Sequence, residues 1–131
     1  MSTPKSDYML FFSGPDWDQG LSPEQLQCAM DRVTTWFDHL AQQGKIKAGH
    51  PLGQDRHIVT AKSSRLLSDG PFAESKEAIG GYLLLEAAGM EEAVKIAESC
   101  PTLQYGITIE VRSVADECPC FKRAKERLAI A

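Results

Sequence analysis

DGPFAESKE, at residues 69–77, is the stretch around which this chain of 131 residues is organised. Pro71 has no backbone N–H and a fixed φ, so it cannot lie within a central strand, and it disfavours the α region for the residue before it. Asp69 can hydrogen-bond to nearby backbone amides, as aspartate does in turns. The stretch therefore predicts a sharp turn after a strand that ends near Ser68, with Phe72 projecting from the turn.

The residues that follow this turn lead into another strand. Ser75 is a candidate cap for a short helical turn that begins at Lys76. GGY, at residues 80–82, permits a bulge or a close backbone approach at the head of an apolar run. Two interpretations stay open: a structural turn that anchors an aromatic side chain, or one wall of a pocket.

The half of the chain before the turn predicts a strand, a helix and further strands. Residues 8–13 are apolar on both alternating faces, which is typical of a buried strand. SPEQ, at residues 22–25, has the Ser, Pro and Gln of a capping box, and Gly44 provides the stop of the helix that begins there. The expected apolar stripe of this helix consists of Leu26, Met30, Val33, Phe37 and Leu40, widened by Ala29 and Trp36.

The remaining elements complete the pattern. We expect a short strand at residues 45–49 that HPLG, at residues 50–53, breaks, which places His50 in a loop. Residues 56–62 and 65–68 predict a hairpin turned around Ser63 and Ser64. After the organising stretch come a strand at 81–87, a helix at 90–100 and a strand at 107–111. We expect residues 1–115 to form one domain and the charged residues 116–131 to form a tail with helical character.

This order predicts an α+β fold of the ferredoxin-like type. Each half contains strand, helix and strand, which is the split βαβ pattern with an antiparallel sheet and both helices on one face. The strands at residues 9–12 and 82–85 are nevertheless apolar on both faces. A second copy of the chain is the simplest cover for the other face, because homodimers dominate small assemblies. We therefore predict a homodimer whose two sheets face each other.

Composition narrows the class of partner. The chain has 14 basic and 18 acidic residues and a formal net charge of -4, so we expect no direct contact with nucleic acid. No apolar run approaches the roughly 18 residues of a membrane span. The polar first residues do not resemble a signal peptide, and a cytoplasmic protein is expected.

The cysteines and histidines predict neither a cofactor nor a metal. Cys28 and Cys100 fall on expected helices and are interpreted as small core residues. Cys118 and Cys120 form a C-x-C pair, which matches zinc and redox sites only weakly. The three histidines contain no i, i+4 pair, and no glycine-rich phosphate loop follows a strand.

The motif at residues 69–77 and the GGY at 80–82 resemble the signature of the YCII-related proteins, in the subgroup named for its Asp-Gly-Pro-Phe (DGPF) motif. Residues 8–12, 48–52 and 109–112 also resemble that family, so the resemblance extends from about residue 8 to 114. It implies a dimeric ferredoxin-like α/β barrel, similar to muconolactone isomerase-type proteins.

The resemblance also implies two kinds of function. Relatives carry a His and Asp pair in a pocket as acid and base, and one branch resembles dehydrochlorinases. Other members accompany alternative sigma factors and are labelled as transcription-initiation proteins. The matching positions in this chain are Asp69 and His50. Whether this chain is an enzyme stays open.

Six residues are candidates for the site. Beside Pro71 and Phe72, Asp69 would be partly desolvated, which raises the pKa of a carboxyl group, whereas a turn-capping aspartate would stay ionised. Glu74 is either a second carboxylate on the same wall or a solvent-facing residue. His50 has the proton affinity of a base at neutral pH. Together with Asp69 and His50, the expected pocket residues are Pro71, Phe72, Glu74 and Tyr82.

Two hypotheses of different classes follow. The first is a small-molecule enzyme that performs a lyase, isomerase or dehalogenase-like step on a small organic acid. The second is a noncatalytic ligand-binding or regulatory protein that acts on the transcription machinery through a protein partner. The net charge does not separate the two hypotheses.

Overall fold

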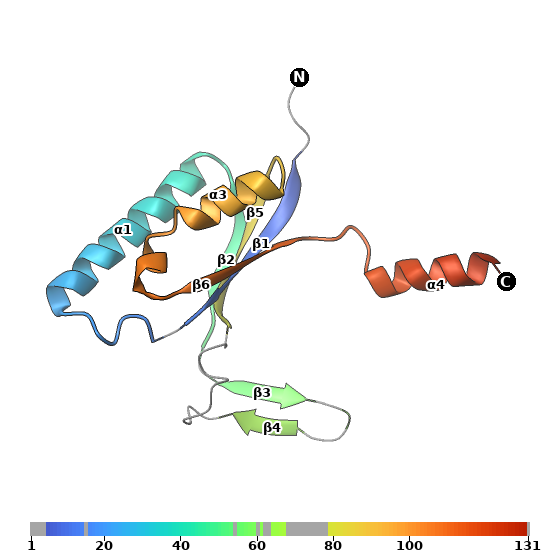
Figure 1. Ribbon diagram of the computed structural model, residues 1–131, viewed down its shortest axis with the longest axis horizontal. Helices are drawn as coiled ribbons and strands as arrows, with labels where there is room; N and C mark the ends of the chain where they lie inside the picture. Colours follow the sequence, from blue (N-terminus) through green and yellow to red (C-terminus); the bar gives the residue numbers. More distant parts are fainter. Residues whose placement is uncertain are drawn as a thin grey trace.

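A computed structural model describes residues 5–14, 16–53, 55–59, 61, 64–67 and 79–130 (Figure 1). In chain order, its elements are β1 (Ser6–Ser13), α1 (Pro23–Gln42), β2 (Ile46–Pro51), β3 (Arg56–Val59), β4 (Ser64–Leu67), β5 (Ile79–Ala87), α3 (Met90–Glu98), the 3₁₀ helix η1 (Pro101–Tyr105), β6 (Thr108–Ser113) and α4 (Pro119–Ile130).

The main sheet has four antiparallel strands in the order β2-β5-β1-β6, and β3 pairs with β4 in a separate hairpin. Leu10 of β1 lies opposite Leu83 of β5 and opposite Val111 of β6. The two halves, β1-α1-β2 and β5-α3-β6, interleave their strands in the order of a ferredoxin-like fold. The α+β class and the antiparallel sheet predicted from the sequence are confirmed.

The core lies between the sheet and the two helices α1 and α3, which lie on the same side of it (Figure 1). Leu10 and Leu85 are fully buried in the sheet. Trp36 of α1 and Ile96 of α3 pack in the same cluster. Both helices therefore bury their apolar sides against one face, as the sequence predicts.

Helix α1 begins and ends where the sequence indicates. The Ser22 side chain accepts from the Gln25 backbone amide at 3.2 Å, and the Gln25 side chain accepts from the Ser22 amide at 2.9 Å. Gly44 has a φ of +71°, which an L-residue adopts only with strain. The buried side of the helix is centred on Ala29 and Trp36, at the edge of the expected stripe.

Two predictions for single residues were wrong. His50 lies in β2 and not in a loop, since β2 continues through Pro51. A proline fits there because β2 is an edge strand, where a missing donor leaves no ladder hydrogen bond unmade. Cys28 is exposed on α1, whereas Cys100 is buried, as expected, just after α3.

Other boundaries differ in detail. The hairpin is present as β3 and β4, but Ser64 begins β4 and is not part of its turn. Pro101 does not simply end α3, because η1 begins at that residue. The helical turn expected after Ser75 lies outside the described residues.

The sheet face opposite α1 and α3 is also apolar at its centre. Met9 lies opposite Leu84, and Phe11 lies opposite Tyr82. All four side chains are half-buried, and they alternate with Leu10 and Leu83, which face the helices. At the margin of this face, Lys47 Nζ lies 3.0 Å from Asp7 Oδ1. The helix layer therefore leaves an apolar strip on the other side of the sheet.

The last helix, α4, extends away from the body of the molecule, beyond the end of β6 (Figure 1). Residues 114–118 form the connection, and Val114 still donates its amide to the Asp7 carbonyl at 3.0 Å. Among the helices of the described ranges, none is both long and apolar enough to cross a membrane.

Candidate functional site

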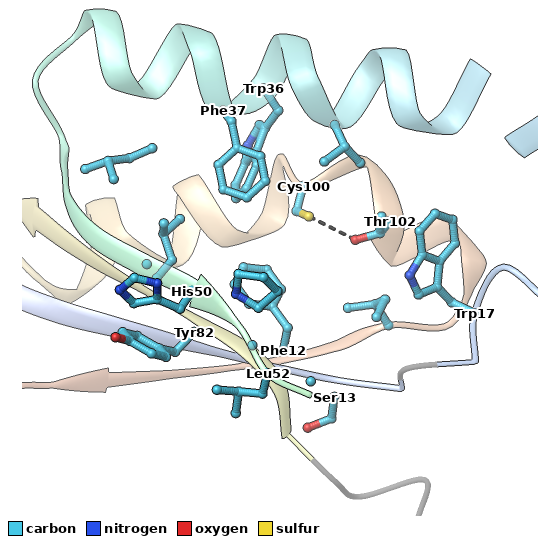
Figure 2. A pocket seen from close by; sticks show the side chains of 18 of the residues that line it. Phe12, Ser13, Trp17, Trp36, Phe37, His50, Leu52, Tyr82, Cys100 and Thr102 are labelled. Atoms are coloured by element: carbon cyan, nitrogen blue, oxygen red, sulfur yellow. Dashed lines mark hydrogen bonds between the residues drawn. The ribbon is translucent and has the colours of Figure 1, made fainter. Parts of the chain in front are cut away.

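A cavity of about 720 Å³ lies between α1 and the helix-covered face of the sheet (Figure 2). Met30, Val33, Trp36 and Phe37 of α1 line one side of it. Its other side consists mainly of sheet residues, among them Phe12, Ile46, Gly49 and Leu83. The walls are therefore largely apolar and aromatic.

Gly49 of β2 leaves little room for a side chain where β2 pairs with β5 beside the cavity. A Cβ on Gly49 would lie 2.8 Å from Leu83 Cδ1 and 3.0 Å from the Tyr82 carbonyl oxygen. A side chain at this position would therefore displace the end of Leu83 and crowd the backbone of β5, which favours glycine. The pairing of the two strands fixes this wall of the cavity.

Trp17 and a pair of polar groups line the end of the cavity near η1. Trp17 stacks on Tyr105 with ring centroids 5.5 Å apart. Cys100 Sγ lies 3.1 Å from Thr102 Oγ1, and both residues are buried (Figure 2). The thiol and the hydroxyl hydrogen-bond to each other. Both polar groups therefore have a partner although they are buried at the cavity wall.

His50 and Tyr82 line the other end of the cavity (Figure 2), at the β2 edge of the sheet. As partners in the β2–β5 pairing they belong to the sheet face opposite α1, since they alternate with Gly49 and Leu83, so the cavity reaches them around that edge. They face each other across β2 and β5, with ring centroids 5.7 Å apart and an angle of 56° between the planes. His50 is exposed and Tyr82 is half-buried. An imidazole and a phenol are thus placed where a ligand in the cavity meets solvent.

The structure brings together two of the six candidate site residues, His50 and Tyr82. The other four, Asp69, Pro71, Phe72 and Glu74, lie outside the described residues, and their roles stay predictions. The segment that contains them connects β4 to β5, and Gly80, Gly81 and Tyr82 at the start of β5 line the cavity.

Sequence reasoning missed most of the cavity wall. Met30, Trp36 and Phe37 were interpreted only as parts of the core stripe of a helix. Met30 and Phe37 are in fact 44% and 36% exposed, so they border open space. The seven apolar positions fall within a stripe of ordinary width for a core-facing helix, so no signal in the sequence separated cavity residues from core residues.

The charges near the cavity are few. Among the lining residues that the structure describes, none is Asp, Glu, Lys or Arg, and the titratable groups are His50, Tyr82 and Cys100. Within the described ranges, no three His, Cys, Asp or Glu side chains converge as metal ligands do. The chemistry visible in this part of the chain is therefore that of an imidazole beside a phenol.

Comparisons with known proteins give one family. A family model described as "YCII-related domain" matches residues 9–119. No curated protein matches significantly. Among solved structures, the 5-chloro-2-hydroxyhydroquinone dehydrochlorinase of Burkholderia phenoliruptrix AC1100, in complex with 2,5-dihydroxybenzoquinone, is 18% identical. The likeness covers 85% of this chain and 95% of that chain, with a TM-score of 0.46.

Proposed function

The chain belongs to the YCII-related domain family, and from that premise we propose that it is a small-molecule enzyme of the DGPF subgroup. Its reaction is an acid–base step of the lyase, isomerase or dehalogenase-like kind on a small organic acid. The cavity beneath α1 receives the substrate, and a homodimer is the working form.

The cavity is the observation that carries this proposal. Its volume of about 720 Å³ lies within the range of roughly 300–1,000 Å³ of small-molecule sites. Apolar and aromatic walls with a few placed polar groups are also typical of such sites. Phe12, Trp36 and Phe37 provide flat surfaces that suit a planar organic ligand.

His50 is the proposed proton carrier. As a neutral imidazole, it takes a proton from a substrate carbon that lies in the cavity. Asp69, which the family resemblance pairs with it, then donates a proton to a substrate atom or to the leaving group. Tyr82, beside His50, orients the imidazole or donates a hydrogen bond to the ligand. The proton removed and the proton returned balance in an isomerase step.

The homodimer is proposed from the open face of the sheet. Met9, Phe11, Tyr82 and Leu84 form an apolar strip there, opposite the helices. A second copy, related by a two-fold axis, would cover the strip with the same strip of its own sheet. The two sheets together would make a dimeric α/β barrel.

The experiment combines a ligand screen with two substitutions. We would screen small organic acids, aromatic ones included, by ligand-observed NMR and follow turnover of every binder. In the enzyme, we expect His50→Gln and Asp69→Asn each to lower kcat by roughly 10²–10⁴-fold while binding is kept. His57→Gln is the matched control, because His57 lies on β3 and not at the cavity.

Each outcome has a meaning. Binding with no turnover of any ligand by the unmodified chain would contradict the enzyme and favour the noncatalytic alternative. An unchanged kcat in His50→Gln would remove that residue from the mechanism. Equal losses in His50→Gln and His57→Gln would show a general effect on the protein and not chemistry at the cavity.

A further inference from the structure

Helix α4 has an exposed apolar stripe of its own. Phe121 is 67% exposed and Leu128 is 76% exposed. They are seven residues apart, so they lie on one side of the helix, about two turns or ~10.5 Å from each other. The family match ends at residue 119, where α4 begins. A helix of 12 residues is marginal alone in water, so α4 gains stability when a surface receives it.

The stripe is flanked by positive charge. Lys122 follows Phe121 directly, and Lys125 lies one turn along on the same flank. The helix has four basic residues and one acidic residue, although the whole chain has a net charge of -4. A basic helix is therefore attached to an acidic domain. Electrostatic attraction favours contact between α4 and the acidic domain of this chain or of a second copy.

Helix α1 carries a stripe of the same spacing and the opposite charge. Met30 and Phe37, 44% and 36% exposed, are also seven residues apart. Asp31 and Asp38 each follow one of them, and both are exposed. In addition, Met30 and Phe37 border the cavity. The stripe on α1 thus forms an uncovered margin of the proposed site.

We propose that α4 of one chain docks antiparallel on α1 of a second copy and completes the wall of its cavity. Lys122 follows Phe121 by one position, as Asp31 follows Met30 and Asp38 follows Phe37, so these charges lie on the same side of the apolar stripe of each helix. Antiparallel docking therefore brings the lysines of α4 to the aspartates of α1. It places Phe121 against Phe37 and Leu128 against Met30.

A second copy is the occupant because of where the two helices lie. Figure 1 shows α1 and α4 at opposite ends of the molecule, with the body between them. Residues 114–118 span at most about 18 Å when fully extended, which limits any return of α4 to its own α1. In a two-fold dimer the contact occurs twice, so each chain would complete the site of the other. The inference rests on the pairing of two copies proposed above.

Photo-crosslinking tests the contact directly. We would place p-benzoylphenylalanine at Phe121 in the full chain and mix chains labelled with ¹⁴N and ¹⁵N. Crosslinked peptides that join light α4 to heavy α1 near Phe37 are the expected result. Crosslinks between peptides of one isotope only, crosslinks to other elements, or no crosslink would each overturn the proposal. The same probe at Glu126, toward the other side of α4, is the control and should not reach α1.

A charge exchange tests the flanking residues. The pair Asp31→Lys and Asp38→Lys should raise the dimer Kd by roughly tenfold or more, as loss of central contacts does. Lys122→Asp with Lys125→Asp should do the same, although Lys125 Nζ also lies 2.7 Å from Glu117 Oε1. Combining all four substitutions should restore the Kd. No restoration would overturn the antiparallel contact.

Light scattering separates this inference from the proposal on which it rests. If the unmodified chain is a monomer, the proposed homodimer fails, and the docking of α4 fails with it. If the unmodified chain is a dimer whose Kd is unchanged by Phe121→Asp with Leu128→Asp, only the docking fails. Circular dichroism of that variant checks that the body is still folded.

Discussion

At the scale of the residue, one hydrogen bond links the two helices of the core. Trp36 Nε1 donates to Ser99 Oγ at 2.7 Å, and that hydroxyl donates to the Ile96 carbonyl at 2.6 Å. We expect Ser99→Ala to lower the free energy of unfolding by about 1–3 kcal/mol, because the partly buried indole N–H loses its partner. Urea denaturation measures this, with Thr34→Ala on the exposed side of α1 as control. Equal midpoints for Ser99→Ala and the control would contradict the expectation.

Gly49 gives a second residue-scale prediction. Gly49→Ala should lower the free energy of unfolding by roughly 1–3 kcal/mol, since the new methyl group would overlap Leu83 and the backbone of β5. Gly20→Ala is the control, because a Cβ there would meet nothing within 4 Å. Thermal unfolding followed by circular dichroism checks both variants. A loss in Gly20→Ala as large as that in Gly49→Ala would remove the steric explanation.

The exposed thiol before α4 gives a pH prediction. Backbone amides of Cys120 and Phe121 donate to Cys118 and hold the pKa of its thiol below the ordinary value of 9.0. The thiolate is the reactive form, so alkylation of Cys118 by iodoacetamide should reach half its maximal rate below pH 9.0 and slow only at lower pH. Rates read by peptide mass spectrometry check this, with Cys118→Ser to assign the signal. A midpoint at or above 9.0 would contradict it.

How far single residues could be predicted depended on what each one needs. Ser22 and Gly44 were predictable, because a helix cap and a left-handed stop are local requirements. Cys28 was not, since its exposure depends on which side of α1 faces the sheet, and that is decided by packing. Sequence periodicity predicts that a helix has an apolar stripe more reliably than it predicts which residues lie at the centre of that stripe.

At the scale of the element, the strands and helices of both halves were predictable from the pattern of apolar residues. The exception that matters for the site is β2, which was expected to end before His50. Its continuation through Pro51 places the imidazole opposite Tyr82 and next to the cavity. A sequence cannot show that β2 is an edge strand, where proline is tolerated.

Helix α1 gives the element-scale prediction. Ser22→Ala removes one half of the capping box and should cost about 1 kcal/mol of stability. Because α1 forms one wall of the cavity, the ligand affinity of the variant should fall as well. Urea denaturation and an NMR titration with any ligand found in the screen measure the two effects. Ser22→Asp is the control, since aspartate also caps helices, and it should keep most of both.

At the scale of the whole molecule, the sheet-to-sheet homodimer stays a prediction that one substitution tests. Leu84→Arg places a charge on the apolar strip opposite the helices. In the proposed dimer that charge would be buried without a partner, so the variant should be largely monomeric. Light scattering after size-exclusion chromatography measures this. Val94→Arg, at a 37% exposed position on α3, is the control and should keep the mass of the unmodified chain.

The fold as a whole was more predictable than the site. The interleaved halves follow from the order of elements, because the ferredoxin-like arrangement buries both helices on one sheet. The cavity wall did not follow, since it depends on side chains from α1, β2 and β5 that are distant in sequence. The two candidate carboxylates, Asp69 and Glu74, lie outside the described residues, so their roles stay predictions, and Asp69→Asn tests the first of them.

The central position of β1 has a consequence for synthesis on the ribosome. β1 is translated before the other strands that the structure describes, yet Leu10 pairs with Leu83 and Val111, which are translated much later. At about 5–20 residues per second, an apolar strand would wait roughly 4–15 seconds for its first sheet partner, β5. During that time its unsatisfied edges are available to other nascent chains. Chaperone binding early in translation should therefore matter more to the yield of this protein than its final stability.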